Sequence, residues 1–243
     1  MHLFTALALP ESKGVTALVG GGGKTSLMYR LGAEYARAGH LVIVTTTTHI
    51  GDPGPEDGRL ILADSPEIKE SLTKAGTVVC VGQRDQLHKL RFPGEAIWAR
   101  CVQEADRVFV EADGSRNLPA KAAAEHEPVI PKGADTVIAV AGLTALEKPI
   151  RESVFRWELA CPLLDESPDT LLTPALLARL LTSPQGQFKG VDDVGKYRVF
   201  LNQADDAHMA ELGAQTAKEI LTLLPGCRVV VGTLRPTVKL WTV

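Results

Sequence analysis

The sequence predicts a three-layer α/β fold, in which a mostly parallel sheet has helices on both faces. Short Val/Ile-rich runs alternate with longer helical patterns along most of the chain. The runs are continuously apolar, which is typical of strands buried on both faces, and strands that alternate with helices imply right-handed crossovers. With 243 residues, of which 45% are hydrophobic and 23% charged, the chain is long enough to bury the core of one such domain.

The elements follow one another with turn signals between them. Strands are expected at 15–19, 41–45, 60–62, 77–81, 108–111, 136–141, 197–201 and 228–231, and helices at 25–38, 66–74, 95–105 and 207–224. Residues 117–133 contain three prolines and are expected to form an ordered surface loop. Residues 144–195 are mostly helical, with Thr173-Pro174 as a helix start, and are expected to be an insertion or subdomain within a single domain, 1–243.

Composition excludes several classes of protein. A net charge of −3 without a basic block makes binding to nucleic acid unexpected, and no apolar run reaches the length of a membrane span. The first ten residues lack the cationic start and cleavage site of a signal peptide. Four scattered cysteines without a C-x-x-C pair suit a reducing cytosol, so we expect a soluble cytoplasmic protein with buried, inert thiols.

A glycine loop between the first expected strand and helix is the clearest motif: Gly20, Gly21, Gly22, Gly23, Lys24, Thr25 and Ser26. Glycines allow backbone N–H groups to turn toward a triphosphate, and the positive end of the following helix adds to the attraction. In such a loop Lys24 reaches the β- and γ-phosphates and Thr25 binds Mg²⁺. The G-x-x-x-x-G-K-[ST] pattern would place glycine at position 18, where Leu18 stands, so this loop is the shorter G-x-x-G-K-T. A plain glycine turn with a solvated lysine is the weaker alternative.

An acidic residue ends the strand expected at 108–111. The run R-V-F-V-E-A-D-G places Glu111 where a Mg²⁺-binding acid stands in phosphate-binding proteins. Asp113 is either a competing Mg²⁺ ligand or the group that orients an attacking water. The spacing to Gly114 imitates the D-x-x-G switch, whose glycine amide faces the γ-phosphate. An ordinary strand end followed by an Asp-Gly turn is the alternative.

The strand at 197–201 continues into N-Q-A-D, which resembles the N-K-x-D sequence that reads guanine. Asp205 could accept hydrogen bonds from the ring N1–H and the exocyclic amine, and Asn202 could tie loops together. Gln203 replaces the lysine whose stem packs on the base, so the choice between ATP and GTP stays open. A cap for the last helix is the alternative use of these residues, and the two uses are compatible.

Further residues could support Mg²⁺ or a γ-phosphate, or contact an anionic second substrate. The T-T-T-T-H stretch ends a strand at the sheet edge where open α/β proteins bind ligands. A cationic segment follows the acidic strand, and a loop histidine lies beyond it. Structural uses, such as β-branched strand residues or a solvated histidine, are the alternatives. The candidates are Thr46, Thr47, His49, Ser115, Arg116, Lys121 and His126.

Five blocks in order, G-G-G-G-K-T-S, T-T-T-T-H-I, V-E-A-D-G-S-R, H-E-P-V-I-P and L-N-Q-A-D, resemble the YqeC family of selenium cofactor biosynthesis proteins. That family is also described as accessory to selenium-dependent molybdenum hydroxylases. The resemblance runs from about Gly14 to about Gly232 and implies a P-loop NTPase fold. It carries over Gly20, Gly23, Lys24 and Thr25 as the phosphate loop, Glu111, Asp113, Gly114, Ser115 and Arg116 as the acidic-strand block, and Asn202 and Asp205 as the base block. Gln203 stands where the family commonly has lysine. The short loop also looks like that of the Mur ligases, which activate carboxylates with ATP.

The leading hypothesis is a Mg²⁺-dependent NTPase, using ATP or GTP, that assists maturation of a selenium- or molybdenum-containing cofactor of a hydroxylase. Lys24, Glu111 and Asp113 would be its catalytic residues, with Thr25 and Glu111 on the metal. A small-molecule kinase or an ATP-dependent ligase is one alternative. A non-catalytic, nucleotide-gated protein that delivers selenium or cofactor is another, which the cysteine pattern supports little. The selenium and hydroxylase part rests on the resemblance alone.

Overall fold

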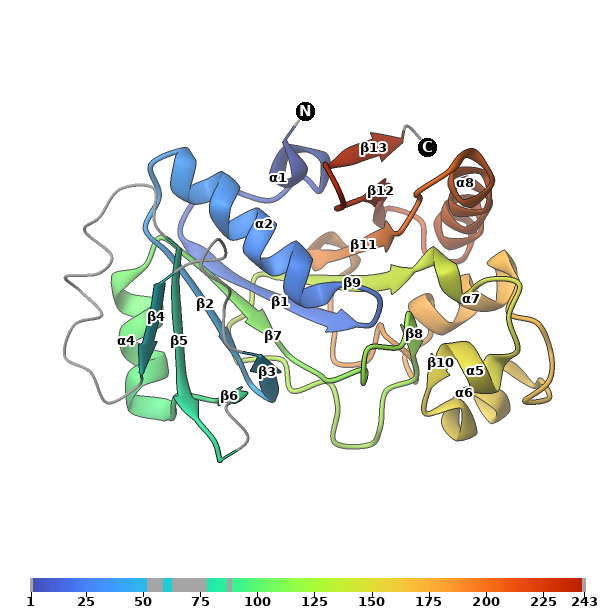
Figure 1. Ribbon diagram of the computed structural model, residues 1–243, viewed down its shortest axis with the longest axis horizontal. Helices are drawn as coiled ribbons and strands as arrows, with labels where there is room; N and C mark the ends of the chain where they lie inside the picture. Colours follow the sequence, from blue (N-terminus) through green and yellow to red (C-terminus); the bar gives the residue numbers. More distant parts are fainter. Residues whose placement is uncertain (1, 52–58, 63–77, 87–88, 242–243) are drawn as a thin grey trace. The chain divides into compact units, whose positions relative to one another are not determined.

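The computed structural model describes residues 2–51, 59–62, 78–86 and 89–241, and the chain divides into two compact units (Figure 1). The first unit comprises Met1–Leu18, Thr25–Asp113 and Val129–Thr136, and the second comprises Val19–Lys24, Gly114–Pro128 and Val137–Val243. The chain therefore passes between the units five times, and two of these crossings come directly after Lys24 and directly after Asp113. A single domain over 1–243 stays a prediction, and the helix expected at 66–74 lies outside the described residues.

The first unit contains a mostly parallel sheet. Its parallel strands are, in spatial order, β1 (Gly14–Gly20), β7 (Arg107–Glu111), β2 (Val42–Thr46) and β5 (Val78–Arg84), with β4 (Arg59–Leu62) also parallel to β5. The antiparallel strands β6 (Lys89–Arg91) and β3 (His49–Gly51) continue from β5. The register places Glu111 opposite Leu18 on one side and opposite Thr46 on the other. The acid that ends β7 is thus fixed beside the end of β1.

Two helices cover opposite faces of this sheet (Figure 1). Gly32 of α2 (Lys24–Arg37) faces the side chains of Val42 and Val78. Cys101 of α4 (Glu95–Glu104) packs in a core cluster with Ile43, which points the other way from Val42. The three-layer α/β prediction is therefore confirmed here. The unit also contains the short helix α1 (Leu3–Ala6).

The second unit has its own parallel strands, β9 (Thr136–Gly142), β11 (Tyr197–Asn202) and β12 (Arg228–Thr233), with β13 (Lys239–Trp241) antiparallel to β12. Helices α7 (Pro174–Thr182) and α8 (Ala207–Leu223) lie side by side, and α8 packs on β12 (Figure 1). Thr173 caps α7, as expected, by accepting a hydrogen bond from the Leu176 N–H. The remaining elements are η1 (Leu143–Ala145), α5 (Ile150–Ser153), α6 (Trp157–Leu164) and η2 (Val194–Lys196).

The expectation that 117–133 forms a surface loop is wrong for its first half. Strand β8 (Ala120–Lys121) pairs with β10 (Val154–Phe155), and Ala120, Lys121 and Ala122 are each only 1% exposed. The small alanine side chains let this segment approach its neighbours closely, although they give no strong apolar signal in the sequence. A buried lysine in such a segment requires a partner for its charge.

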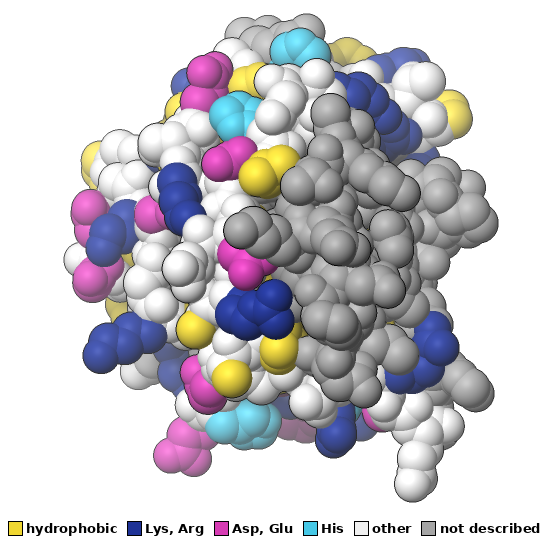
Figure 2. Space-filling view, turned by 90° about the vertical axis from the view of Figure 1, so that its left-hand side faces the viewer, with side chains coloured by type: hydrophobic (Ala, Val, Ile, Leu, Met, Phe, Trp, Pro, Cys, Tyr) yellow, Lys and Arg dark blue, Asp and Glu magenta, His cyan; other side chains and the backbone are white. Residues whose placement is uncertain are grey.

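Charges of both signs are interspersed on the face shown in Figure 2, and hydrophobic side chains occur there singly or in small groups. The coloured part of that face shows no continuous stripe of Lys and Arg side chains of the kind that binds a nucleic-acid backbone. In the ranges that the structure describes, none of the helices combines the length and the apolar character needed to cross a membrane.

Candidate functional site

The glycine loop joins β1 to α2, and its backbone needs glycine. The φ angles are +72° at Gly22 and +122° at Gly23, a region that side chains with a Cβ rarely adopt. A Cβ on Gly22 would collide with the backbone of Gly142, and one on Gly23 would collide with the side-chain amide of Asn202. The loop therefore has its shape because glycines allow the chain to pass this close to its neighbours.

Two amides of the loop are used by the protein itself. The Gly21 N–H donates to the Val140 carbonyl at 2.9 Å, and the Gly22 N–H donates to the Leu118 carbonyl at 3.1 Å. In this structure these two amides are therefore used within the protein, and their contact with a phosphate stays a prediction. The first amides of α2, which begins at Lys24, have no partner within the helix and are the donors suited to an anion.

Lys24 is 3% exposed and folds back across the loop, where its ammonium donates to the Gly20 carbonyl at 2.6 Å. Asn202, at the end of β11, donates from Nδ2 to the Gly22 carbonyl at 2.7 Å. The Asn202 Oδ1 atom is buried and accepts no hydrogen bond in the described part of the chain. These two contacts hold the loop in shape and bring the N-Q-A-D segment beside it.

Thr25 and Glu111 meet in the first unit. The Thr25 hydroxyl donates to the Glu111 carboxylate at 2.6 Å, and Glu111 is buried. A hydroxyl and a carboxylate are the two protein ligands that a phosphate-bound Mg²⁺ takes, the others being phosphate oxygens and water. Among the described residues, no three or more His, Cys, Asp or Glu side chains come together in a cluster that would hold a metal without a nucleotide.

The threonine stretch serves mainly the sheet. The Thr45 and Thr46 hydroxyls donate to the Val81 and Glu111 carbonyls, at 2.7 and 2.9 Å. The Thr47 hydroxyl donates to the Val129 carbonyl at 2.9 Å, and the exposed His49 lies 3.9 Å from an Asp85 carboxylate oxygen. The hydroxyls of Thr45, Thr46 and Thr47 therefore all donate to backbone carbonyls. This favours the structural use of these threonines, which the sequence left open.

Asp113 and Gly114 are the next two residues of the acidic-strand block after Glu111. Asp113 is fully buried at the end of the first unit, and Gly114 opens the next segment of the second unit. A Cβ on Gly114 would meet no atom within 4 Å. Steric crowding in this structure therefore does not require glycine at position 114.

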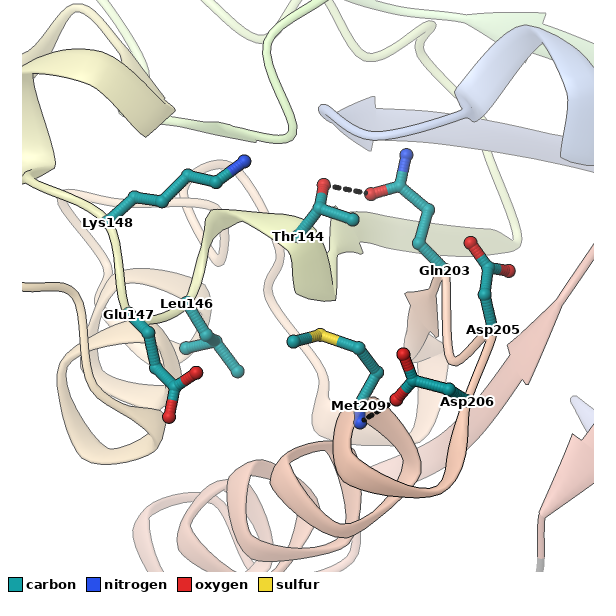
Figure 3. A pocket seen from close by; sticks show the side chains of 8 residues that line it. All are labelled: Thr144, Leu146, Glu147, Lys148, Gln203, Asp205, Asp206 and Met209. Atoms are coloured by element: carbon teal, nitrogen blue, oxygen red, sulfur yellow. Dashed lines mark hydrogen bonds between the residues drawn. The ribbon is translucent and has the colours of Figure 1, made fainter.

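A cavity of about 390 Å³ in the second unit is lined by Gln203 and Asp205 of the N-Q-A-D segment (Figure 3). The Gln203 backbone is left-handed, with φ of +69°, and its Oε1 accepts from the Thr144 hydroxyl at 2.6 Å. The other lining residues are Thr144, Leu146, Glu147, Lys148, Asp206 and Met209.

The helix cap and the cavity acid are two different residues. Asp206 caps α8 by accepting from the Met209 N–H at 2.8 Å. Asp205 accepts from the Thr233 hydroxyl at 2.6 Å. The capping use that the sequence left open therefore belongs to Asp206, and the Asp205 carboxylate lines the cavity (Figure 3).

A buried ion cluster lies where the sequence indicated only candidate cations. The Lys121 ammonium lies 2.6 Å from the Glu127 carboxylate and donates to the Gly114 carbonyl at 2.6 Å. The Arg156 guanidinium contacts the same carboxylate. Burial raises the pKa of Glu127, but hydrogen bonds and charge from Arg156 and Lys121 outweigh it and hold the pKa below its ordinary value. His126, the residue that the sequence singled out here, is exposed.

The comparisons with known proteins agree with the resemblance. The model of the family described as YqeC protein matches residues 16–158. A protein of Escherichia coli (strain K12), described as "Uncharacterized protein YqeC", is 35% identical over 193 residues, which cover 78% of this chain and 75% of that protein. The chain belongs to the YqeC family.

Two solved structures show weaker likeness to this YqeC-family chain. They are the hydrogenase maturation factor HypB from Archaeoglobus fulgidus (TM-score 0.41, 10% identity, 95% of this chain and 86% of that one) and HypB from Helicobacter pylori in complex with nickel (TM-score 0.37, 10% identity, 92% and 80%). TM-scores below 0.5 at this identity support no conclusion about function, and the α/β fold stands on the strand order and helix packing above.

The cysteines of this YqeC-family chain are buried, as expected. Burial raises the pKa of Cys101 to about 12 and the pKa of Cys227 to about 11. At neutral pH these thiols are therefore protonated, which makes them poor nucleophiles and poor metal ligands.

Proposed function

We propose that this YqeC-family protein is a Mg²⁺-dependent nucleoside-triphosphatase that prefers GTP. The observation that carries the proposal is the 2.6 Å hydrogen bond from the Thr25 hydroxyl to the Glu111 carboxylate. Thr25 follows directly on the glycine loop and Lys24 in the chain, so the residue that ends the phosphate loop also contacts the acid at the end of β7. This is the pairing that Mg²⁺ with a bound triphosphate uses.

Each residue would have a distinct role. Lys24 would leave the Gly20 carbonyl to neutralise charge on the transferring phosphoryl group, and the first amides of α2 would donate to the phosphates. Thr25 and Glu111 would hold Mg²⁺, which neutralises charge on the β- and γ-phosphates when bound. The buried Asp113 would orient the attacking water.

The preference for guanine rests on Asp205. Its carboxylate lines the cavity beside the loop-binding Asn202 and offers only hydrogen-bond acceptors. Guanine presents an N1–H and an amine to such a group, whereas adenine presents an unprotonated ring nitrogen that a carboxylate repels. The Gln203 side chain, held by Thr144, replaces the lysine stem as one wall of the cavity.

We expect the native protein to bind GTP more tightly than ATP by about tenfold or more, since hydrogen bonds to a charged group stabilise by about 1.5–3 kcal/mol. Asp205→Asn should remove most of that difference. Asp206→Asn is the matched control, because asparagine also caps a helix well and the carboxylate at 206 is used by the cap. Equilibrium titration of the three proteins with each nucleotide and Mg²⁺ measures the ratio, and an unchanged ratio in Asp205→Asn would contradict the base assignment.

The reaction is proposed to assist maturation of a selenium- or molybdenum-containing cofactor of a hydroxylase. The support for this part is the family to which the chain belongs and the resemblance to its sequence blocks. Phosphate release without any added acceptor would favour a hydrolase. Release that appears only with an added acceptor would favour the kinase or ligase, and tight binding with no release at all would favour a nucleotide-gated carrier.

A further inference from the structure

We propose that the second unit holds a separate site for a small organic anion, in which a phosphate or carboxylate group is attached to a flat apolar body. The site is a cavity of about 480 Å³. Three arginines and two aromatic rings share its lining with one carboxylate: Arg116, Arg151, Arg156, Phe155, Trp157 and Glu158. Aromatic walls suit a flat body, and guanidinium groups suit an oxyanion.

Three cationic side chains surround the Phe155 ring. The charged groups of Arg156, Lys121 and Arg116 lie 4.8, 5.7 and 5.4 Å from its centroid. Each contact is favourable by itself, but three cations around one ring repel one another unless anions are nearby. Glu127 compensates Lys121 and Arg156, and within the described ranges Arg116 pairs with no carboxylate.

Arg116 is therefore the guanidinium of this cavity that remains for a ligand. Arg151 contacts the Asp169 and Glu152 carboxylates, and Arg156 contacts Glu127. Arg116 is exposed, and its planar fork can bind a phosphate or carboxylate with two parallel hydrogen bonds. Glu158, also on the lining and exposed, would discriminate against ligands with a second negative charge at its end of the cavity.

The backbone is strained on both sides of the cavity. Arg116, Asn117 and Arg156 have φ angles of +49°, +63° and +61°, which residues with a Cβ seldom adopt. Such conformations persist where the surroundings impose them, and they gather at ligand-binding sites. Here they determine the direction in which the Arg116 and Arg156 side chains leave the backbone beside Phe155.

The cavity also adjoins the glycine loop. Leu118 lines the cavity, and its carbonyl accepts the Gly22 N–H at 3.1 Å. A ligand beside Arg116 would therefore contact the segment that holds the loop. We assign to this ligand the role of second substrate or cargo of the nucleotide reaction, and this role, unlike the binding itself, rests on the proposed function.

Phenyl phosphate, which combines a flat ring with a phosphate, is the probe. Calorimetric titration of the full chain should show saturable binding of phenyl phosphate. Inorganic phosphate should bind more weakly, and benzyl alcohol should show no binding. Arg116→Asn should weaken the binding by about tenfold or more, and Arg116→Lys by less, because lysine restores the charge without the fork. Asparagine tolerates the left-handed backbone, so the loop keeps its conformation. Arg100→Ala, in the first unit, should have no effect.

The variant Lys24→Ala distinguishes binding in this cavity from binding at the glycine loop. It should leave the affinity for phenyl phosphate unchanged, whether or not it removes nucleotide binding. A second readout uses Trp98→Phe with Trp241→Phe, which leaves Trp157 as the only tryptophan; its fluorescence should change over the same concentrations. Absence of saturable binding, equal affinity in Arg116→Asn, or loss of binding in Lys24→Ala would each overturn the proposal.

Discussion

Replacement of Glu111 by glutamine should lower Mg²⁺-dependent hydrolysis of the nucleotide by roughly 100-fold. The substitution keeps a side-chain oxygen that can accept the Thr25 hydroxyl, so the contact that joins α2 to β7 can persist. It removes the one carboxylate that this contact offers to a metal. The Mg²⁺ concentration for half-maximal activity should rise as well, because a neutral amide is a weaker ligand for a hard cation.

Phosphate release measured across a series of Mg²⁺ concentrations tests this expectation. Glu95→Gln, at an exposed position on α4 of the same unit, removes the same charge and should leave both quantities unchanged. If Glu111→Gln has the activity and the Mg²⁺ dependence of the native protein, then Glu111 is an ordinary strand end.

Replacement of Glu127 by alanine should lower the free energy of unfolding by about 3 kcal/mol or more. The Lys121 side chain has no exposed surface and pairs with Glu127, so the variant removes a carboxylate that compensates a buried charge. The double variant Lys121→Met with Glu127→Leu removes both charges and fills a similar volume, so it should regain most of the stability. Urea unfolding measures all three proteins, and a double variant no more stable than Glu127→Ala would contradict this explanation.

The same pair gives a pH dependence with a definite sign. The folded protein holds the pKa of Glu127 below the ordinary value of 4.5. The stabilisation is therefore present above pH 4.5 and is lost as the pH falls through the lower folded pKa. Glu127→Gln should accordingly be less stable than the native protein near neutrality, and the difference should shrink in acid.

The fold could be predicted from the sequence because the buried parallel strands are long apolar runs. The short antiparallel strands β3 and β6 have three residues each, which is too few for an alternating pattern to be recognised. The glycine loop and the acid of β7 are local motifs, so their positions could also be predicted. Their hydrogen bonds could not, and two loop amides donate to carbonyls that lie almost 100 and 120 residues further along the chain.

Other errors arose where burial depends on tertiary contacts. Residues 117–133 contain three prolines, which is typical of a loop, yet pairing of β8 with β10 buries Lys121. The sequence therefore indicated His126, whose residue type is common at functional sites, and missed its neighbour Glu127. A lysine among alanines at 120–124 is the signal that could have pointed to a buried partner. The capping residue was ambiguous for a different reason, because Asp205 and Asp206 are adjacent and both suit a helix start.

The proposed function requires that the glycine loop with Lys24 binds the triphosphate of a Mg²⁺-bound nucleotide. Equilibrium titration of the native protein and of Lys24→Ala with GTP and Mg²⁺ tests it most directly. We expect saturable binding at one site in the native protein and a loss of about tenfold or more in affinity in Lys24→Ala, because the variant lacks the charge that compensates the phosphates. Equal affinity in the two proteins, or no binding of GTP or ATP to the native protein, would contradict the account.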